Sequence, residues 1–200
     1  MLITLEGIDG CGKSTLHASL GKLLHEFSPV MTQEPGATWI GDQVRRAIAE
    51  QSDPIAEALL FVADHAAHLG EVVRPALAKG KLVISHRYID SRFAYQEVTL
   101  MEFLPDPVRW LTEVHNGWTI MPDLTFLLVL PVEVALARIE KRGSTEHFEN
   151  SEVLTRVQQI FLDRAQAEPG RFVIIDATLA PDVILKFVGG EITKRMRTVR

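Results

Sequence analysis

The 200-residue sequence contains one cysteine, Cys11, and no long run of apolar residues. A single thiol excludes an intrachain disulfide framework and a metal site built from cysteines. No stretch approaches the roughly 18 consecutive apolar residues that a membrane span needs. The first residues also lack the charged and apolar segments of a signal peptide. From these absences we expect a cytoplasmic protein that does not bind membranes.

The sequence also lacks an excess of positive charge, since its formal net charge is −5. General nucleic-acid binders carry a basic face, so we do not expect a nucleic acid as partner. A nucleotide enzyme remains compatible with this charge, because a few arginines in a cleft can hold phosphates on an acidic protein. The length, with 46% hydrophobic and 24% charged residues, suits one globular domain over residues 1–200.

Short apolar runs alternate with longer amphipathic stretches, which is typical of an α/β fold with a parallel sheet flanked by helices. The predicted strands are residues 2–5, 30–32, 82–85, 124–130 and 172–175. The predicted helices are residues 14–26, 41–51, 54–78, 91–97, 107–115, 132–141 and 152–167. From residue 181 onward we expect a further helix that is interrupted at Gly189 and Gly190.

Residues 7–14 read Gly-Ile-Asp-Gly-Cys-Gly-Lys-Ser and fit the pattern G-x-x-x-x-G-K-[ST]. They follow a predicted strand and open a predicted helix, which is the context that a phosphate-binding P-loop requires. In such a loop, glycines let backbone N–H groups surround phosphate oxygens. Lys13 would reach the β- and γ-phosphates and the Ser14 hydroxyl would bind Mg²⁺. The sequence therefore predicts a P-loop that binds a nucleoside triphosphate with magnesium.

A P-loop occurs in GTPases and motor ATPases as well as in kinases. GTPases carry an Asn-Lys-x-Asp motif after a later strand, but residues 130–133 read Leu-Pro-Val-Glu after the fourth predicted strand. The small size disfavours a motor. These observations favour a kinase of small phosphorylated molecules.

Several motifs resemble those of the thymidylate kinase family, in the same order along the chain. The phosphate loop, including Asp9, is similar to that of the family, and residues 33–38 resemble its Arg-Glu-Pro-Gly-Gly-Thr segment. Further similar segments are residues 60–64, 87–91, 94–96, 122–125 and 176–178. The resemblance spans almost the whole chain and is therefore more specific than the phosphate loop alone.

The resemblance implies an adenylate-kinase-like P-loop NTPase fold with five parallel strands, phosphorylation of dTMP to dTDP with ATP and Mg²⁺ in dTTP biosynthesis, and a homodimer. It implies a lid over ATP at about residues 138–150. The implied catalytic residues are Lys13, Asp9, Arg87 and Arg142. The implied ATP-binding residues are Gly7, Ile8, Asp9, Gly10, Cys11, Gly12, Lys13, Ser14, Thr15 and Arg138, with Ser14 at the metal. The implied substrate-binding residues are Glu34, Pro35, Arg45, Phe61, His65, Arg87, Arg92, Tyr95 and Gln96.

Five positions depart from the family pattern. Gln33, His65 and His147 replace arginines, His86 replaces an aspartate expected near magnesium, and Arg92 replaces a small residue that faces the base. Arg92 either supplies the donor that position 65 has lost, points to solvent, or belongs to a pocket with altered specificity. A neutral His86 could accept a hydrogen bond from a metal-bound water, whereas a protonated one would repel the ion.

Two rival functions follow from these departures. One is a kinase for another or a modified pyrimidine nucleoside monophosphate, which the changes at His65 and Arg92 suggest. The other is a non-catalytic nucleotide-binding protein, which the changes at His86 and His147 suggest.

Overall fold

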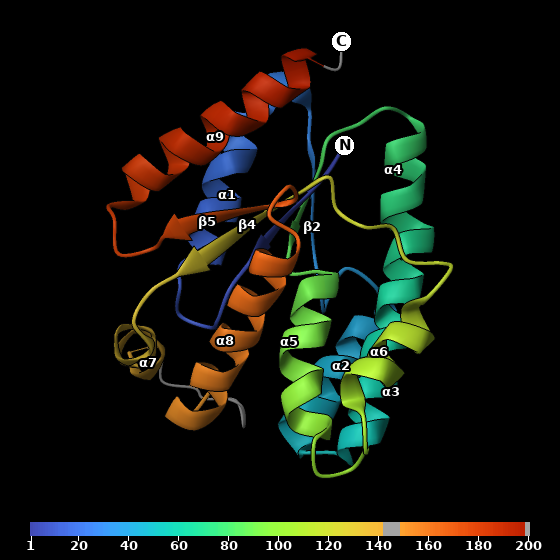
Figure 1. The fold of residues 1–200 in the computed structure, drawn as a ribbon. Helices are drawn as coiled ribbons and strands as arrows, with labels where there is room; N and C mark the ends of the chain where they lie inside the picture. The colour runs from blue at the N-terminus through green and yellow to red at the C-terminus, as the bar shows by residue number, and fades with distance from the viewer. Residues whose placement is uncertain (142–148, 199–200) are drawn as a thin grey trace.

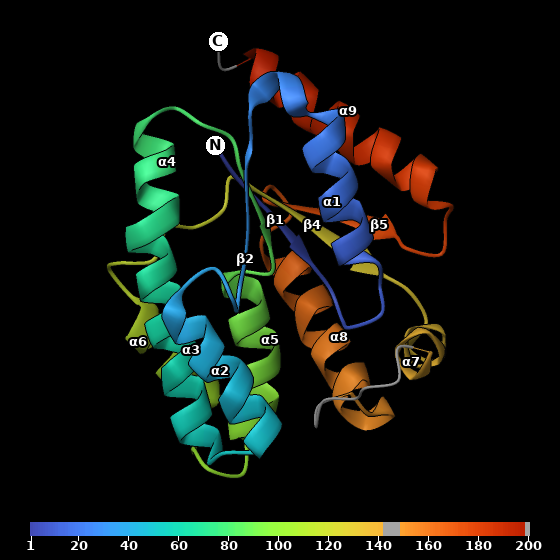
Figure 2. The same cartoon turned by 180° about the vertical axis from the view of Figure 1, so that it is seen from behind.

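A computed structural model of the protein describes residues 1–141 and 149–198. Its centre is a sheet of five parallel strands in the order β2-β3-β1-β4-β5. Figures 1 and 2 show this sheet between the helices from two opposite sides. The predicted α/β fold with five parallel strands is confirmed. The strands are β1 (Leu2–Glu6), β2 (Val30–Gln33), β3 (Val83–His86), β4 (Leu124–Val129) and β5 (Phe172–Asp176).

Burial of the sheet explains why most residues of the central strands β1, β3 and β4 are apolar. All five residues of β1 are buried, and Ile3 lies between Ile84 of β3 and Leu124 of β4. Helices α1 (Lys13–Leu23) and α9 (Pro181–Thr198) pack together on one face, and α5 (Ile89–Leu100) and α8 (Ser151–Ala167) pack together on the other (Figures 1 and 2). A parallel sheet is stable only when both faces are covered in this way.

The remaining helices surround this layered centre. They are η1 (His25–Phe27), α2 (Trp39–Glu50), α3 (Pro54–His68), η2 (Leu69–Val73), α4 (Arg74–Ala78), α6 (Pro107–His115) and α7 (Val132–Glu140). In residues 1–141 and 149–198, no helix combines the length and the apolar character that crossing a membrane requires.

The helix predicted over residues 54–78 is divided by one π-helical turn, η2. Asp53 caps its beginning, since the carboxylate accepts from the N–H groups of Ile55 and Ala56 at 3.0 and 3.1 Å. Pro75, near the start of α4, explains the π turn. Proline has no N–H, and its ring would clash with the carbonyl one turn earlier in a regular α-helix.

The interruption predicted at Gly189 and Gly190 is wrong, because α9 runs without a break from Pro181 to Thr198. Gly189 is buried where α9 packs on α1, and a Cβ atom there would lie 2.4 Å from Cδ2 of Leu23. The glycine thus allows two helices to approach closely and does not end one of them. Pattern reasoning cannot separate these two uses of glycine.

Replacing each of the two glycines with alanine should have different effects on stability. Gly190 is exposed with open space at its Cβ position. Gly190→Ala should therefore raise the free energy of unfolding by about 0.5–1 kcal/mol through reduced backbone entropy. Gly189→Ala should gain less or lose stability, because the new methyl group must displace Leu23. Urea unfolding of both variants measures the difference, and an equal gain from both would contradict the close packing.

Candidate active site

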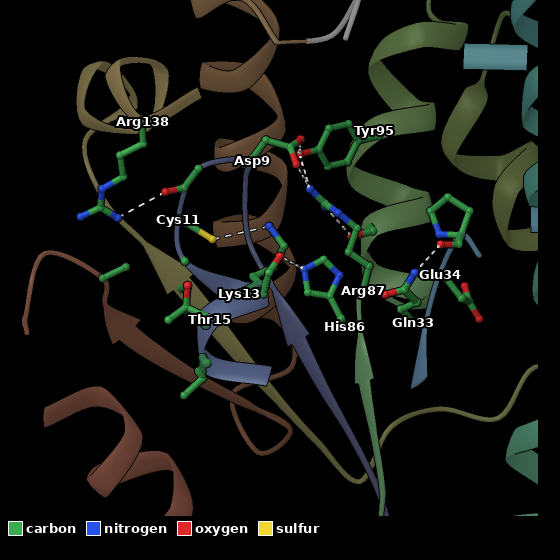
Figure 3. A pocket seen from close by; sticks show the side chains of 18 of the residues that line it. Asp9, Cys11, Lys13, Thr15, Gln33, Glu34, His86, Arg87, Tyr95 and Arg138 are labelled. Atoms are coloured by element: carbon green, nitrogen blue, oxygen red, sulfur yellow. Dashed lines mark hydrogen bonds and ion pairs between the residues drawn. The ribbon is translucent and has the colours of Figure 1, made fainter. Parts of the chain in front are cut away.

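A cleft of about 730 Å³ opens at the carboxyl edge of the sheet. The loops after β1, β2 and β3 line it, together with side chains from α2, α3, α5, α7 and the start of α9. Strand β1 lies between β3 and β4. From β1 the strand order continues to β3 and β2 on one side and to β4 and β5 on the other, so the order reverses at this point. Open parallel sheets bind ligands at such a switch point. The P-loop occupies the middle of the cleft, as Figure 3 shows.

The glycines of residues 7–12 are required by the local backbone. Gly7, Gly10 and Gly12 all have positive φ values, of 134°, 77° and 99°. A Cβ atom would lie 2.3 Å from the Leu128 carbonyl oxygen at Gly7 and 2.5 Å from the Ala135 carbonyl oxygen at Gly10. Among the described residues, no side chain caps the start of α1 at Gly12. The first N–H groups of α1 are therefore available to an anion, which the helix dipole also favours.

Lys13 is 4% exposed, and its ammonium group lies inside the loop. Nζ donates to the carbonyl oxygens of Gly7 at 3.0 Å and Ile8 at 2.8 Å, and lies 3.6 Å from Sγ of Cys11. Burial, with repulsion from Arg87, lowers the pKa of Lys13. The loop carbonyls thus fix a buried amine at the place where phosphate oxygens would approach. Gly7 and Ile8 act through their carbonyl groups here and do not line the cleft themselves.

His86, at the end of β3, interacts with the metal-ligand candidate Ser14. Its Nε2 lies 3.1 Å from the Ser14 hydroxyl. Burial, together with the positive charges of Lys13 and Arg87, lowers the pKa of His86 to about 2. The imidazole is therefore neutral at physiological pH and can accept from Ser14. Of the two protonation states considered from the sequence, the neutral one is favoured. His86 also lines the cleft, although it was not among the predicted site residues.

Arg87 connects the P-loop to α5. One guanidinium nitrogen donates to the Gly7 carbonyl at 3.2 Å and the Ser91 hydroxyl at 2.9 Å, and the other lies 2.6 Å from the Asp9 carboxylate (Figure 3). The Tyr95 hydroxyl donates to the second Asp9 oxygen at 2.7 Å. Although burial opposes ionisation, Arg87 and Lys13 hold the pKa of Asp9 below its usual range. The predicted residues Asp9, Arg87 and Tyr95 therefore form one hydrogen-bonded cluster.

Glu34 is the centre of the cleft wall on the far side of Arg87. Its Oε1 accepts from Nδ1 of His65 at 2.8 Å and of His68 at 2.6 Å, and its Oε2 lies 3.3 Å from Nη2 of Arg92. Although burial opposes ionisation, these partners hold the pKa of Glu34 well below its usual range. Arg92 is 3% exposed, which excludes the solvent-facing alternative. Its guanidinium carbon lies 4.1 Å from the centre of the Phe61 ring.

His65 was predicted to bind the substrate, but its side chain does not line the cleft. Its side chain is fully buried behind Glu34 and packs on the rings of Tyr88 and Trp118, at centroid distances of 4.7 and 5.4 Å. An imidazole is shorter than the arginine of the family pattern, and Glu34 holds it in the interior. In contrast, Pro35, Arg45, Tyr95 and Gln96 all line the cleft, and Arg45 donates to the Pro35 carbonyl at 2.8 Å.

The other end of the cleft lies beyond the P-loop. Arg138, on α7, donates to the Gly10 carbonyl at 3.2 Å, and Thr15 lies at the same end of the cleft in Figure 3. Arg142 and His147, which were expected in a lid, lie outside the described residues. An apolar wall at this end was not predicted, and only the motif at residues 176–178 pointed to it. It consists of Leu16, Ala177, Leu179, Pro181, Ile184 and Leu185.

A second charged network attaches α5 to the sheet. The fully buried carboxylate of Asp90 lies 2.6 Å from Nη1 of Arg171 and 2.8 Å from Nη2 of Arg164. Arg164 belongs to α8, and Arg171 precedes β5. Because Arg92, Tyr95 and Gln96 follow Asp90 on the same helix, this network fixes the position of their backbone.

The chain is similar to several known proteins. The model of the thymidylate kinase family matches residues 5–188. A probable thymidylate kinase of Methanospirillum hungatei is 63% identical over 98% of this chain and 95% of its own length. One of Methanoculleus marisnigri is 58% identical over 100% of this chain and 98% of its own length. The crystal structure of thymidylate kinase from Ehrlichia chaffeensis is 27% identical, covers 98% of both chains and has a TM-score of 0.72.

Glu6, directly before the P-loop, should make stability depend on pH. Its side chain is fully buried, and Ser91 donates to it at 2.5 Å. Burial and the neighbouring Asp90 carboxylate raise the pKa of Glu6 from 4.5 to about 7. Between these pH values the folded state binds more protons than the unfolded state, so the free energy of unfolding falls as pH rises. Above pH 7 the free energy of unfolding should be lower by about 3 kcal/mol, because one pKa unit corresponds to about 1.4 kcal/mol.

Glu6→Gln should remove this part of the pH dependence, because an amide keeps the acceptor for Ser91 and does not titrate. Chemical unfolding at pH 5 and pH 8 measures it, with the exposed Glu152→Gln as the control. A Glu6→Gln variant that loses as much stability as the parent between these pH values would show that Glu6 does not titrate there.

Proposed function

Because this chain belongs to the thymidylate kinase family, we propose that it transfers the γ-phosphoryl group of ATP to dTMP, giving dTDP and ADP. The observation that carries the proposal is the position of Arg87. Its guanidinium contacts the P-loop at Gly7 and α5 at Ser91, between the two ends of one continuous cleft. A cation at this junction can neutralise both the donor and the acceptor phosphates.

The donor nucleotide would bind at the P-loop end. The backbone N–H groups of residues 9–15, which line the cleft, and the Lys13 ammonium would hold its phosphates. Arg138 would add a charge from α7, beside the Gly10 carbonyl that it contacts. The apolar wall formed by Leu179 and its neighbours is suited to a flat purine base.

The residues at Ser14 fit a magnesium ion. In the part of the chain that the structure describes, no three His, Cys, Asp or Glu side chains gather into a metal cage. Mg²⁺ does not need one, since it keeps several waters and binds through substrate phosphates with one or two protein oxygens. The Ser14 hydroxyl can supply such an oxygen, and the neutral His86 beside it adds no positive charge. When bound, the ion would neutralise charge on the β- and γ-phosphates.

The acceptor would bind on the Glu34 side of Arg87. Arg87 and Arg45 would grip its phosphate, because a planar guanidinium can donate two parallel hydrogen bonds. Tyr95 would lie beside the sugar with Asp9, and Phe61 and Gln96 would contact the base. Glu34 and Pro35 would form the wall that holds these groups.

Transfer itself needs no protein nucleophile. An oxygen of the acceptor phosphate attacks the γ-phosphorus, the bond to the β–γ bridging oxygen breaks, and ADP leaves with that electron pair. The protein therefore acts by alignment and by neutralisation of charge. Lys13 and Arg87 can do both, because backbone carbonyls and the Asp9 carboxylate already fix them in place. Asp9 would limit the net positive charge and orient Arg87.

The acceptor preference is tested by ADP release with Mg-ATP and a panel of dTMP, dUMP, UMP, dCMP and 5-substituted dUMP analogues. We expect the largest kcat/KM for dTMP. Faster turnover of a different monophosphate would mean that the changes at Gln33, His65 and Arg92 have altered the pocket. ATP binding without transfer to any acceptor would favour the non-catalytic alternative.

Lys13→Ala should lower kcat by about 100- to 1000-fold, which is the typical cost of removing one preorganised charge stabiliser. The variant should remain folded, because burial already makes the ammonium of Lys13 unfavourable. Lys22→Ala, at an exposed position of the same helix, is the matched control and should keep full activity. Lys13→Ala activity near that of the control would contradict the proposed role of the P-loop.

The single domain, the homodimer and the cytoplasmic location stay predictions. The half-exposed Leu59 on α3 offers apolar surface to a second copy. Sedimentation equilibrium of the full chain measures the oligomeric state.

A further inference from the structure

Three buried polar atoms in the acceptor half of the cleft have no hydrogen-bond partner among the described residues. They are Nε of Arg92 and both side-chain amide atoms of Gln96. Arg92 and Gln96 are 3% and 1% exposed, lie one turn apart on α5, and both line the cleft. Leaving such groups unpaired is costly, so each buried unsatisfied group in a native protein requires an explanation. A polar ligand edge that meets both residues would supply it.

Arg92 is held firmly from two sides. The Phe61 ring lies under the guanidinium at 4.1 Å, and the Glu34 carboxylate lies 3.3 Å from Nη2. Glu34 is itself fixed, since Nδ1 atoms of His65 and His68 both donate to its other oxygen. Because a carboxylate only accepts, each of these Nδ1 atoms must carry a hydrogen. The two histidines therefore position Glu34, and Glu34 positions Arg92.

The two residues differ in what they can recognise. The amide of Gln96 has one donor and one acceptor group, and it can rotate to exchange them. It can match O4 and N3–H of thymine, and after rotation also N4–H₂ and N3 of cytosine. A guanidinium has donors only and cannot adapt. Arg92 therefore removes the ambiguity that Gln96 alone would leave.

We propose that Arg92 is a specificity-determining residue that reads the 4-carbonyl oxygen of a pyrimidine acceptor, with Gln96 paired to the adjacent N3–H. Glu34, His65 and His68 position Arg92 for this contact. The inference rests on the proposed function, since it concerns the base of the monophosphate acceptor. A 4-amino base is rejected because its N–H groups would face the donors of Arg92 and leave them unpaired. His65, which Glu34 holds in the interior, takes no direct part.

The test compares dTMP with 5-methyl-dCMP, which carry the same methyl group, sugar and phosphate and differ only at the 4-position and N3. Equilibrium binding of each nucleotide is measured by calorimetry, and kcat and KM are measured with Mg-ATP. The parent protein should bind dTMP at least about 100-fold more tightly, because sites built on buried hydrogen bonds reject analogues strongly. A parent protein that binds both nucleotides equally would overturn the proposal.

Two variants distinguish recognition of the base by Arg92 from a role of Arg92 in packing alone. Arg92→Lys keeps a donor-only cation, and its preference for dTMP should stay within about threefold of the parent. Arg92→Gln places a rotatable amide there, and the preference should fall at least about tenfold, the effect of one charge-assisted hydrogen bond. In both variants kcat at saturating dTMP should change less than KM, because Arg92 does not contact the reacting phosphates. Arg109→Gln, at an exposed site on α6, is the control and should match the parent.

An Arg92→Gln variant that keeps the parent preference would overturn the proposal, as would an Arg92→Lys variant that loses it to the same extent. Circular dichroism checks that both are folded. If Arg92→Gln does not fold, Gln96→Leu replaces it, and its preference should likewise fall at least about tenfold. Failure of the parent to phosphorylate dTMP would count against the proposed function. Normal transfer to dTMP with an unchanged preference in the variants would count against the role of Arg92 alone.

Discussion

The ion pair between Arg87 and Asp9 is the constraint on which the two halves of the cleft depend. Strands β1 and β3 are neighbours in register, so the P-loop and Arg87 leave the same edge of the sheet side by side. Arg87 has a φ of 65°, a backbone conformation that costs a non-glycine residue roughly 1–3 kcal/mol. The contacts to Gly7, Asp9 and Ser91 offset this cost. The sheet and these contacts thus fix the position of Arg87 relative to the P-loop.

The acceptor half shows how a change at one position is accommodated by its neighbours. Burying Glu34 would be prohibitive without compensation, because an isolated carboxylate in the interior is strongly destabilised. The structure supplies two histidines and one arginine to it, on α3 and α5. His65 and Arg92, which each depart from the family pattern, are therefore two parts of one arrangement around the same carboxylate. Neither substitution is understandable alone.

Much of this could be predicted from the sequence, because its signals are local. The strands are short apolar runs, and the P-loop is contiguous, so periodicity and spacing were sufficient to find them. The direction of His65, the neutral state of His86 and the continuity of α9 could not be predicted in the same way. Each depends on a partner distant in sequence: Glu34 for His65, Lys13 and Arg87 for His86, and Leu23 for Gly189. Long-range packing and charge decide such features, and a single sequence does not contain them explicitly.

Helix α5 separates the residues that hold it from the residues that face the ligand. Asp90 attaches its first turn to Arg164 and Arg171, while Arg92 and Gln96 project from the same helix into the cleft. Substitutions of Arg92 or Gln96 leave the ion pairs of Asp90 intact. Natural selection can therefore exchange the side chains at positions 92 and 96 and change this wall of the cleft, while the helix keeps its place and the contacts of Lys13 and Arg87 are inherited unchanged.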